Sequence, residues 1–333
     1  MNINNIYKNI QKRSKLWNYY NKDILVPDIL DASECETFIK NYIKASEKAS
    51  LVLVDNVSKI KNDSPQRMTH IVSTFFLGLW LYNNKFCFIR KHIREEISSL
   101  RCFLTEDDIN QQFTYVWFMA TIFHDLGYPA ELKGASLPNH EIPAQEHANS
   151  IPDFYKEIYI GYYKYRNNKE HGIFAGLKFD EDICKIRNFQ EYSLSTELSW
   201  RKELDLLYHY VAWIILAHNI WLVRDDNKYA QKYRTNALQE LILSSEKDDN
   251  GKYLNYKFSF DEYPLFAFFC IIDTIEPTKI TCTLSTVDIK LGKGGDIIVK
   301  SNDKNYLEKV NSLNEWLVPT TMEENTVLIH LNS

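Results

Sequence analysis

Residues 115–129 read YVWFMATIFHDLGYP, an apolar stretch that ends in a histidine and an aspartate, followed by a glycine and a proline. Apolar side chains recur every three or four positions, which predicts a buried helix over residues 105–126 that stops at Gly127. His124 and Asp125 therefore belong to its last turn. An ionised carboxylate in such apolar surroundings needs a partner, because its burial alone is costly.

Outward from this helix, three further histidines and one aspartate lie in or beside apolar helical stretches. His70 follows the helix-start signal Ser64-Pro65. The other three are His171 at the head of a short helix predicted over residues 172–177, His218 after a helix over 204–216, and Asp273 near the end of a helix over 265–275. The last turn of a helix favours a cation, because exposed carbonyls and the negative end of the helix dipole meet there.

Imidazole nitrogen and carboxylate oxygen are ligands of borderline divalent cations, so this set predicts a dispersed metal site. Each residue also has a simpler interpretation. His70 alone can be a hydrogen-bonded core histidine, His124-Asp125 a buried ion pair at a helix end, and Asp273 the partner of an Arg or Lys. No basic residue adjoins Asp125 or Asp273 in the sequence, which favours a shared cation over two separate ion pairs.

The fold class predicted for the chain is mainly α, with a small C-terminal α/β subdomain. Only 10 Gly and 9 Pro occur in 333 residues, and apolar periodicity of helical type runs through most of them. We expect a helical N-terminal lead-in over residues 1–50, with helices over 6–20 and 34–48, and a metal-binding helical domain over 51–280. Residues 281–333 alternate in a way that predicts strands over 283–290, 296–300 and 326–331 and a helix over 306–316.

Composition restricts the partners and the compartment. The chain has 39 Lys and Arg against 44 Asp and Glu, a net charge of -5, which argues against nucleic acid or an anionic membrane as a partner. Its six cysteines contain no Cys-x-x-Cys pair, which indicates buried thiols in a reducing compartment and argues against zinc held by thiolates. Without a signal core or an apolar run long enough to span a bilayer, a cytoplasmic location is expected. The oligomeric state is left open.

Residues 133–153 interrupt the helical pattern with three prolines in a polar stretch. A long excursion of this kind is a candidate lid over the site. Within it, His140 and His147 are expected to be exposed loop histidines.

In its ordered set of motifs the chain resembles the HD-domain metal-dependent phosphohydrolases, over about residues 63–277. The motifs are Arg67-Met68-Thr69-His70, then Phe123-His124-Asp125-Leu126-Gly127, and finally Ile271-Ile272-Asp273-Thr274, with His171 and His218 between the last two. The resemblance implies an HD-domain-like helical bundle. Many members of the family continue the His-Asp pair with Gly-Lys, whereas Tyr128 stands here, so a cation that would neutralise phosphate is missing at that place.

The resemblance implies one or two divalent transition metal ions, of which Mn, Fe, Co, Ni or Zn suit a nitrogen-rich site. The first would be held by His70, His124, Asp125 and Asp273, and the second by His171 and His218 with Asp125 bridging. His124 and Asp125 thereby belong to the catalytic set. Arg67, one helical turn before His70, could hold a phosphate, or be an exposed arginine at a helix start. Glu131 could act in acid-base chemistry, or be a solvated loop charge.

The expected activity is metal-dependent hydrolysis of a phosphoester or phosphoanhydride in a phosphorylated, nucleotide-like small molecule, by water that the metal activates. No Ser-His-Asp elbow or Gly-rich phosphate loop offers another route. Three alternatives stay open: a nucleotide-binding or regulatory module that keeps the fold without turnover, a di-iron oxygenase on the same ligand set, and a single-strand nuclease.

Overall fold

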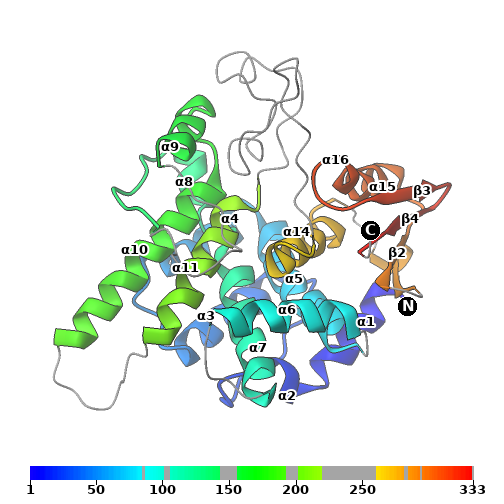
Figure 1. Cartoon of the computed structure of the whole chain (residues 1–333), viewed down its shortest axis with the longest axis horizontal. Helices are drawn as coiled ribbons and strands as arrows, with labels where there is room; N and C mark the ends of the chain where they lie inside the picture. Colours follow the sequence, from blue (N-terminus) through cyan, green and yellow to red (C-terminus); the bar gives the residue numbers. More distant parts are fainter. Residues whose placement is uncertain are drawn as a thin grey trace.

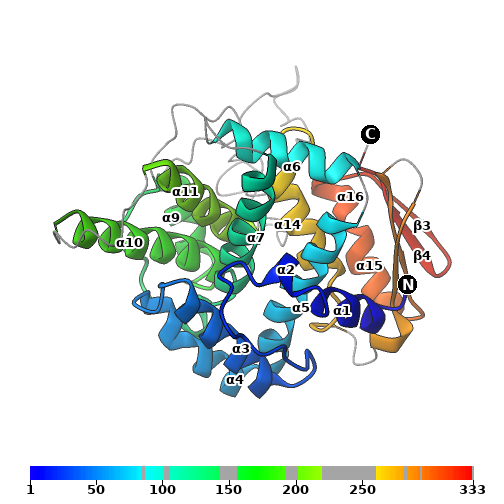
Figure 2. The ribbon, with the colours of Figure 1, turned by 90° about the horizontal axis from the view of Figure 1, so that it is seen from below.

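The computed structural model describes residues 1–84, 87–100, 106–142, 156–192, 202–219, 260–280, 284–292 and 295–331. Within these ranges the chain is mainly helical, with one small antiparallel sheet near the C-terminus (Figure 1), so the predicted fold class is confirmed. The long helices α10 and α11 lie towards one end of the molecule, and the sheet with its two helices lies at the other, beside the N-terminus (Figures 1 and 2). The division at residues 50 and 280 stays a prediction.

The N-terminal helices pack around the core. They are α1 (Ile3–Gln11), α2 (Ser14–Trp17), α3 (Ala32–Ala45), the 3-10 helix η1 (Val52–Asn56) and α4 (Val57–Asp63). The single helix predicted over residues 6–20 is thus two helices, whose chain turns at Lys12 and Arg13. Asp31 caps α3 as its sequence context indicates, because its carboxylate accepts hydrogen bonds from two backbone N–H groups of the first turn.

Eight further helices carry or support the candidate site. They are α5 (Pro65–Asn83), α6 (Cys87–Ser99), α7 (Glu106–Phe123), α8 (Tyr128–Lys133), α9 (Lys156–Tyr165), α10 (His171–Tyr192), α11 (Lys202–Ala217) and α14 (Pro264–Ile275). α5 begins with the predicted proline in its first turn. The short helix predicted over residues 172–177 is wrong in length, since α10 has 22 residues. The short helix α8 was not predicted.

Glycines set the close approach of the site-bearing helices. A Cβ on Gly78 of α5 would lie 2.0 Å from the ring of Trp117 of α7, and the indole of Trp117 donates a hydrogen bond to the carbonyl of Phe75 at 2.9 Å. On α10, a Cβ on Gly172 or Gly176 would lie 3.0 or 2.6 Å from a backbone carbonyl oxygen of α11. The main chains of α10 and α11 are therefore almost in contact, and the ring of Trp117 packs directly on the main chain of α5, which positions these helices relative to one another.

Glu96 is a fully buried carboxyl that ties three helices together. It stands on α6, takes a hydrogen bond from the backbone N–H of Leu265 at 2.7 Å, and accepts another from the hydroxyl of Tyr210. Leu265 is in the first turn of α14, so Glu96 satisfies one of the free N–H groups at the start of that helix. Burial raises the pKa of Glu96 to about 8, although both hydrogen bonds favour the charged form.

The C-terminal sheet has the strand order β1-β2-β4-β3 and is antiparallel throughout. Its elements are the 3-10 helix η3 (Leu284–Thr286), β1 (Asp288–Leu291), β2 (Ile297–Lys300), α15 (Lys304–Asn311), α16 (Leu313–Trp316), β3 (Thr320–Glu323) and β4 (Thr326–Ile329). The strand predicted from residue 283 is wrong at its start, where η3 stands instead, and β3 was missed. Backbone hydrogen bonds join residues 1–3 to residues 287–289, so the N-terminus lies against β1 of the sheet.

Among the described residues, no helix combines the length and the apolar character that crossing a membrane requires.

Candidate metal centre

Six predicted ligands from five helices converge on one buried position. They are His70 of α5, His124 and Asp125 directly after α7, His171 at the first position of α10, His218 directly after α11, and Asp273 near the end of α14. All six are buried, and the most exposed of them, His171, is 6% exposed. Residues separated by as much as 203 positions in the sequence thus share one site.

The first group of the centre is formed by His70, His124 and Asp273. Nε2 of His70 lies 2.7 Å from Oδ1 of Asp273, and Nε2 of His124 lies 3.6 Å from the same oxygen. A second group shares His124: ligand atoms of His124, Asp125 and His218 all lie within 4.8 Å of one another. Nε2 of His171 lies 3.0 Å from Oδ1 of Asp125. These distances are suited to one or two cations between the side chains.

Each of the four imidazoles is oriented by its Nδ1 atom. Nδ1 of His124 donates to the carbonyl of Thr121 at 2.7 Å, and Nδ1 of His218 donates to the carbonyl of Ile215 at 2.6 Å. The other two use carboxylates at 2.5 Å: Glu276 for His70 and Glu131 for His171. An imidazole held in this way presents Nε2, and a carbonyl or carboxylate behind the ring is the arrangement typical of metal-bound histidines.

Three buried atoms at the centre lack a hydrogen-bond partner among the described residues. They are Nε2 of His124, Nε2 of His218 and Oδ2 of Asp125. Buried polar atoms are almost always paired, because an unpaired one costs about 1–3 kcal/mol. Two lone pairs on nitrogen and one carboxylate oxygen that point into the same small space are the donors a divalent cation requires. The side chains present therefore fit a metal ion.

Two basic side chains contact the carboxylates from the more exposed side. Arg67 donates to Oδ1 of Asp125 at 2.9 Å, and Nζ of Lys279 lies 3.2 Å from Asp273 and 3.5 Å from Asp125. Each carboxylate thus has the basic partner that the simpler ion-pair interpretation requires, although no basic residue adjoins Asp125 or Asp273 in the sequence. The guanidinium of Arg67 lies 3.8 Å from the ring centre of Tyr128, so this ring holds a positive charge beside the centre.

The protonation states of Asp125, Asp273, His124 and His218 favour cation binding, whereas at His171 burial would lower the pKa but hydrogen bonds to Asp125 and Glu131 raise it. Burial would raise the pKa of Asp125 and of Asp273, but Arg67 and Lys279 hold the pKa of Asp125, and Lys279 that of Asp273, well below the usual range. Burial lowers the pKa of His124, and burial together with the neighbouring imidazoles lowers that of His218 further. Neutral imidazoles beside ionised carboxylates are the state in which these groups bind metal.

Glu131 and Glu276 orient His171 and His70 through hydrogen bonds to the Nδ1 atoms of these rings. Glu131 lies on α8, where it accepts from the backbone N–H of His171 at 2.9 Å as well as from its ring, so it also caps the start of α10. Its interpretation as a solvated loop charge is wrong, since it stands in a helix and is bonded twice. Glu276 and Lys279 were not predicted as site residues. Both follow Asp273 within six positions, and this closeness in the sequence was the available signal; the structure shows that Glu276 is fully buried.

The candidate lid is described only in part, over residues 133–142, and His147 lies outside the described residues. The expectation that His140 is an exposed loop histidine is wrong. Its side chain is 19% exposed, and its Nε2 lies 2.6 Å from a carboxylate oxygen of the fully buried Asp180 on α10.

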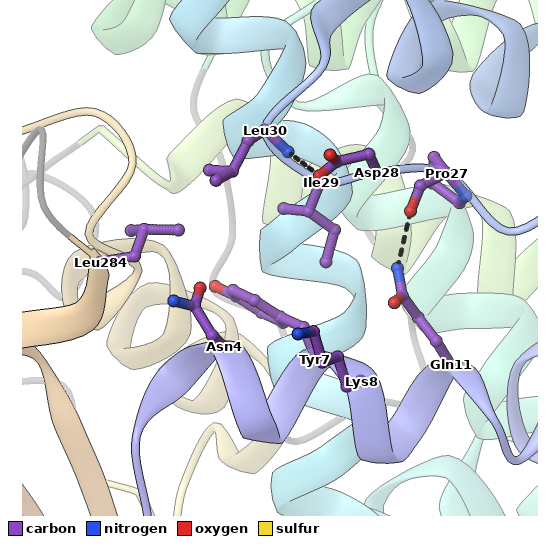
Figure 3. A pocket seen from close by; sticks show the side chains of 9 residues that line it. All are labelled: Asn4, Tyr7, Lys8, Gln11, Pro27, Asp28, Ile29, Leu30 and Leu284. Atoms are coloured by element: carbon purple, nitrogen blue, oxygen red, sulfur yellow. Dashed lines mark hydrogen bonds between the residues drawn. The ribbon is translucent and has the colours of Figure 1, made fainter.

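Two described pockets are each connected to the centre by a lining side chain. One, of about 450 Å³, contains Lys279, which contacts both carboxylates; its other lining residues are Gln66, Thr69 and Thr278 and the apolar Leu30, Ala32, Pro65, Ile280 and Leu284. The other, of about 370 Å³, lies between α1 and the segment before α3 (Figure 3). Tyr7 lines it, and its hydroxyl donates to Glu276 at 3.3 Å, behind His70.

No family model matches this chain, and neither a curated protein nor a solved structure is significantly similar to it. The buried His and Asp groups are therefore the observations from which a function can be argued.

Proposed function

We propose that the protein is an HD-type metal-dependent phosphohydrolase that cleaves a phosphoester or phosphoanhydride bond in a nucleotide-like small molecule. The observation that carries this proposal is the common orientation of four imidazoles: each is held at Nδ1, and Nε2 of three of them, His70, His124 and His171, lies within 3.6 Å of Asp125 or Asp273. An ion-pair network in the core has no need of four such rings. A site that holds cations does, because the Nδ1 partner fixes both the tautomer and the angle of each ligand.

The ligands divide between two positions. His70, His124, Asp125 and Asp273 would hold the first ion, and His171 and His218 the second, with Asp125 shared. One or two divalent ions would polarise a phosphoryl oxygen and lower the pKa of a bound water towards neutrality. Mn, Fe, Co, Ni and Zn suit this nitrogen-rich set.

The residues around the centre would bind the phosphate of the substrate and orient the ligand His171. Arg67 and Lys279 present two positive charges at the more exposed side of the centre, where the side chain of each is 21% exposed. A phosphate that enters there meets a planar fork of donors and a mobile ammonium, which together neutralise its charge. Glu131 keeps His171 in place and lies close enough to the same opening to accept a proton from a water molecule.

The pocket that contains Lys279 supports the substrate class. Its volume of about 450 Å³ lies within the usual range for small-molecule sites, and Gln66, Thr69 and Thr278 offer amide and hydroxyl groups to a sugar or base. Lys279 belongs both to this pocket and to the centre. A molecule bound in the pocket can therefore place a phosphate against the centre.

The direct test is elemental analysis of the purified protein, followed by a screen of phosphorylated compounds with and without the bound metal. We expect at least one equivalent of a transition metal per chain, release of phosphate or of a phosphorylated product, and loss of that activity after chelation. Re-addition of the ion should restore the rate. A metal-free protein that keeps full activity would refute the proposal.

A second candidate function is a regulatory module that binds a nucleotide at this site without turnover. It is favoured by the pairing of Arg67 and Lys279 with the two carboxylates, which balances charge at the centre without any ion. Tight binding of a nucleotide to metal-free protein, with no product formed on addition of any of the five ions, would support this alternative.

Replacement of Lys279 by methionine separates the two candidates. The ammonium lies within 3.5 Å of both carboxylates, so it opposes any cation placed between them. Two like charges a few ångströms apart repel by about 4 kcal/mol at the effective dielectric of a protein surface, so even partial relief should strengthen metal binding by about tenfold or more. The measurement is the dissociation constant for Mn²⁺ or Zn²⁺ by calorimetry, with exposed Lys300→Met as the matched control. Unchanged or weaker metal binding would favour the ion-pair interpretation.

A further inference from the structure

A second cluster of metal-ligand side chains lies away from the proposed centre. It consists of His140, in the segment that follows α8, with Asp180 and Cys184 one helical turn apart on α10. One ligand atom from each lies within 4.8 Å of the other two. Asp180 stands nine residues beyond His171 on α10, which is about 13 Å along the helix axis. The two clusters therefore do not share a ligand.

The carboxylate of Asp180 is the middle of this cluster. One of its oxygens lies 2.6 Å from Nε2 of His140, and the other accepts from Nδ1 of His209 on α11. Asp180 is fully buried, whereas His140 and Cys184 are partly exposed, so an ion can reach the open side from solvent. His209 holds the carboxylate from behind, as outer-shell partners do at metal sites.

The donor set decides which ion would suit the cluster. A ring nitrogen, a carboxylate oxygen and a thiol sulfur form a mixed set of the kind that zinc accepts, and the thiol excludes magnesium and calcium as preferred ions. A chain of His-Asp-His ion pairs accounts for His140, Asp180 and His209, and Cys184 contacts His140 at the partly exposed side of the same cluster. The other two cysteines described with side chains, Cys35 and Cys270, are buried, whereas Cys184 is not.

We infer that His140, Asp180 and Cys184 form a separate Zn²⁺ site, with its fourth position open to solvent, that fastens the segment after α8 to α10. This inference does not depend on what the buried centre does. The cysteine spacing argues against zinc held by several thiolates, and it cannot reveal a mixed set whose members come from different elements. Through α8 and α10 the site would also steady the contact between Glu131 and His171.

Cobalt titration of the metal-stripped full chain tests the inference. A thiolate bound to Co²⁺ gives a charge-transfer band in the near ultraviolet, and the proposed ligands of the buried centre include no cysteine. We expect this band to appear on titration and to be removed by Zn²⁺. Cys184→Ser should abolish it, and His140→Gln should weaken the binding that produces it by about tenfold or more.

Two controls keep the result specific. Cys35→Ser should leave the band unchanged, because that thiol lies on α3 and contacts the carbonyls of Asp28 and Ile29. Cys270→Ser should also leave it unchanged, although Cys270 is only three residues from Asp273. Circular dichroism confirms that each variant is folded. The absence of a band from the wild-type chain, or a band that survives Cys184→Ser, would overturn the inference.

Discussion

Replacement of Asp125 by asparagine is expected to lower the hydrolytic rate by about 10³-fold, with loss of at least one bound ion. Asp125 is the ligand that both metal positions would share, and the amide keeps its shape while it loses the charge. Metal activation of water and phosphoryl groups is worth several kcal/mol, so loss of the shared ligand has an effect of this size. The measurement combines kcat/KM with metal content per chain.

The matched control for this variant is Asp55→Asn, an exposed aspartate of η1 whose replacement should change neither quantity. Asp125→Asn leaves Arg67 without its carboxylate partner, so the melting temperature of each variant has to be recorded as well. A folded Asp125→Asn protein with wild-type metal content and a rate within tenfold of wild type would contradict the role assigned to Asp125.

The wild-type chain should lose stability between about pH 4.5 and pH 8 relative to Glu96→Gln. In the unfolded chain Glu96 loses its proton near its ordinary pKa of 4.5, whereas in the folded chain burial keeps the proton until about pH 8. The folded state therefore binds more protons across this interval, and its free energy of unfolding falls as pH rises. The shift corresponds to a relative loss on the order of 4 kcal/mol.

Urea unfolding of both proteins at about pH 5 and about pH 8 measures this difference. Gln can accept from the N–H of Leu265 and donate to Tyr210, so the variant keeps the links between α6, α11 and α14. The matched control is Glu95→Gln, the next residue along, whose side chain is 62% exposed. Parallel pH dependence of wild type and Glu96→Gln would show that Glu96 is not the group that titrates.

Local signals in the sequence were enough for the elements that carry the candidate site. The Pro65 start of α5 and the apolar run of α14 depend on short-range chemistry, and both were predicted close to their observed places. The predicted end of α7 is wrong by three residues, because the helix ends at Phe123, so His124 and Asp125 lie directly after it, and Gly127 precedes the first residue of α8. The convergence of His70, His124 and Asp273 was predicted from a resemblance and from the cost of buried carboxylates. The roles of these residues remain proposals.

The parts that were missed depend on contacts between distant segments. Lys279 follows a predicted helix end and gives no sign in the sequence that it meets Asp125, which precedes it by 154 positions. The partial burial of His140 was missed because its partner Asp180 stands on a helix that was predicted too short. The side chains of β3 alternate only between partly exposed and exposed, and its sequence shows little apolar alternation. Its pairing with β4 defines it as a strand.

The glycines of α10 have a consequence for ion selectivity. Since Gly172 and Gly176 bring the main chain of α10 against that of α11, helix packing fixes the separation of the backbones that carry His171 and His218. A fixed separation between two ligands discriminates between cations by ionic radius. Of the two proposed metal positions, the one between these histidines should thus be the more selective, and any larger residue at 172 or 176 should change which ion it accepts.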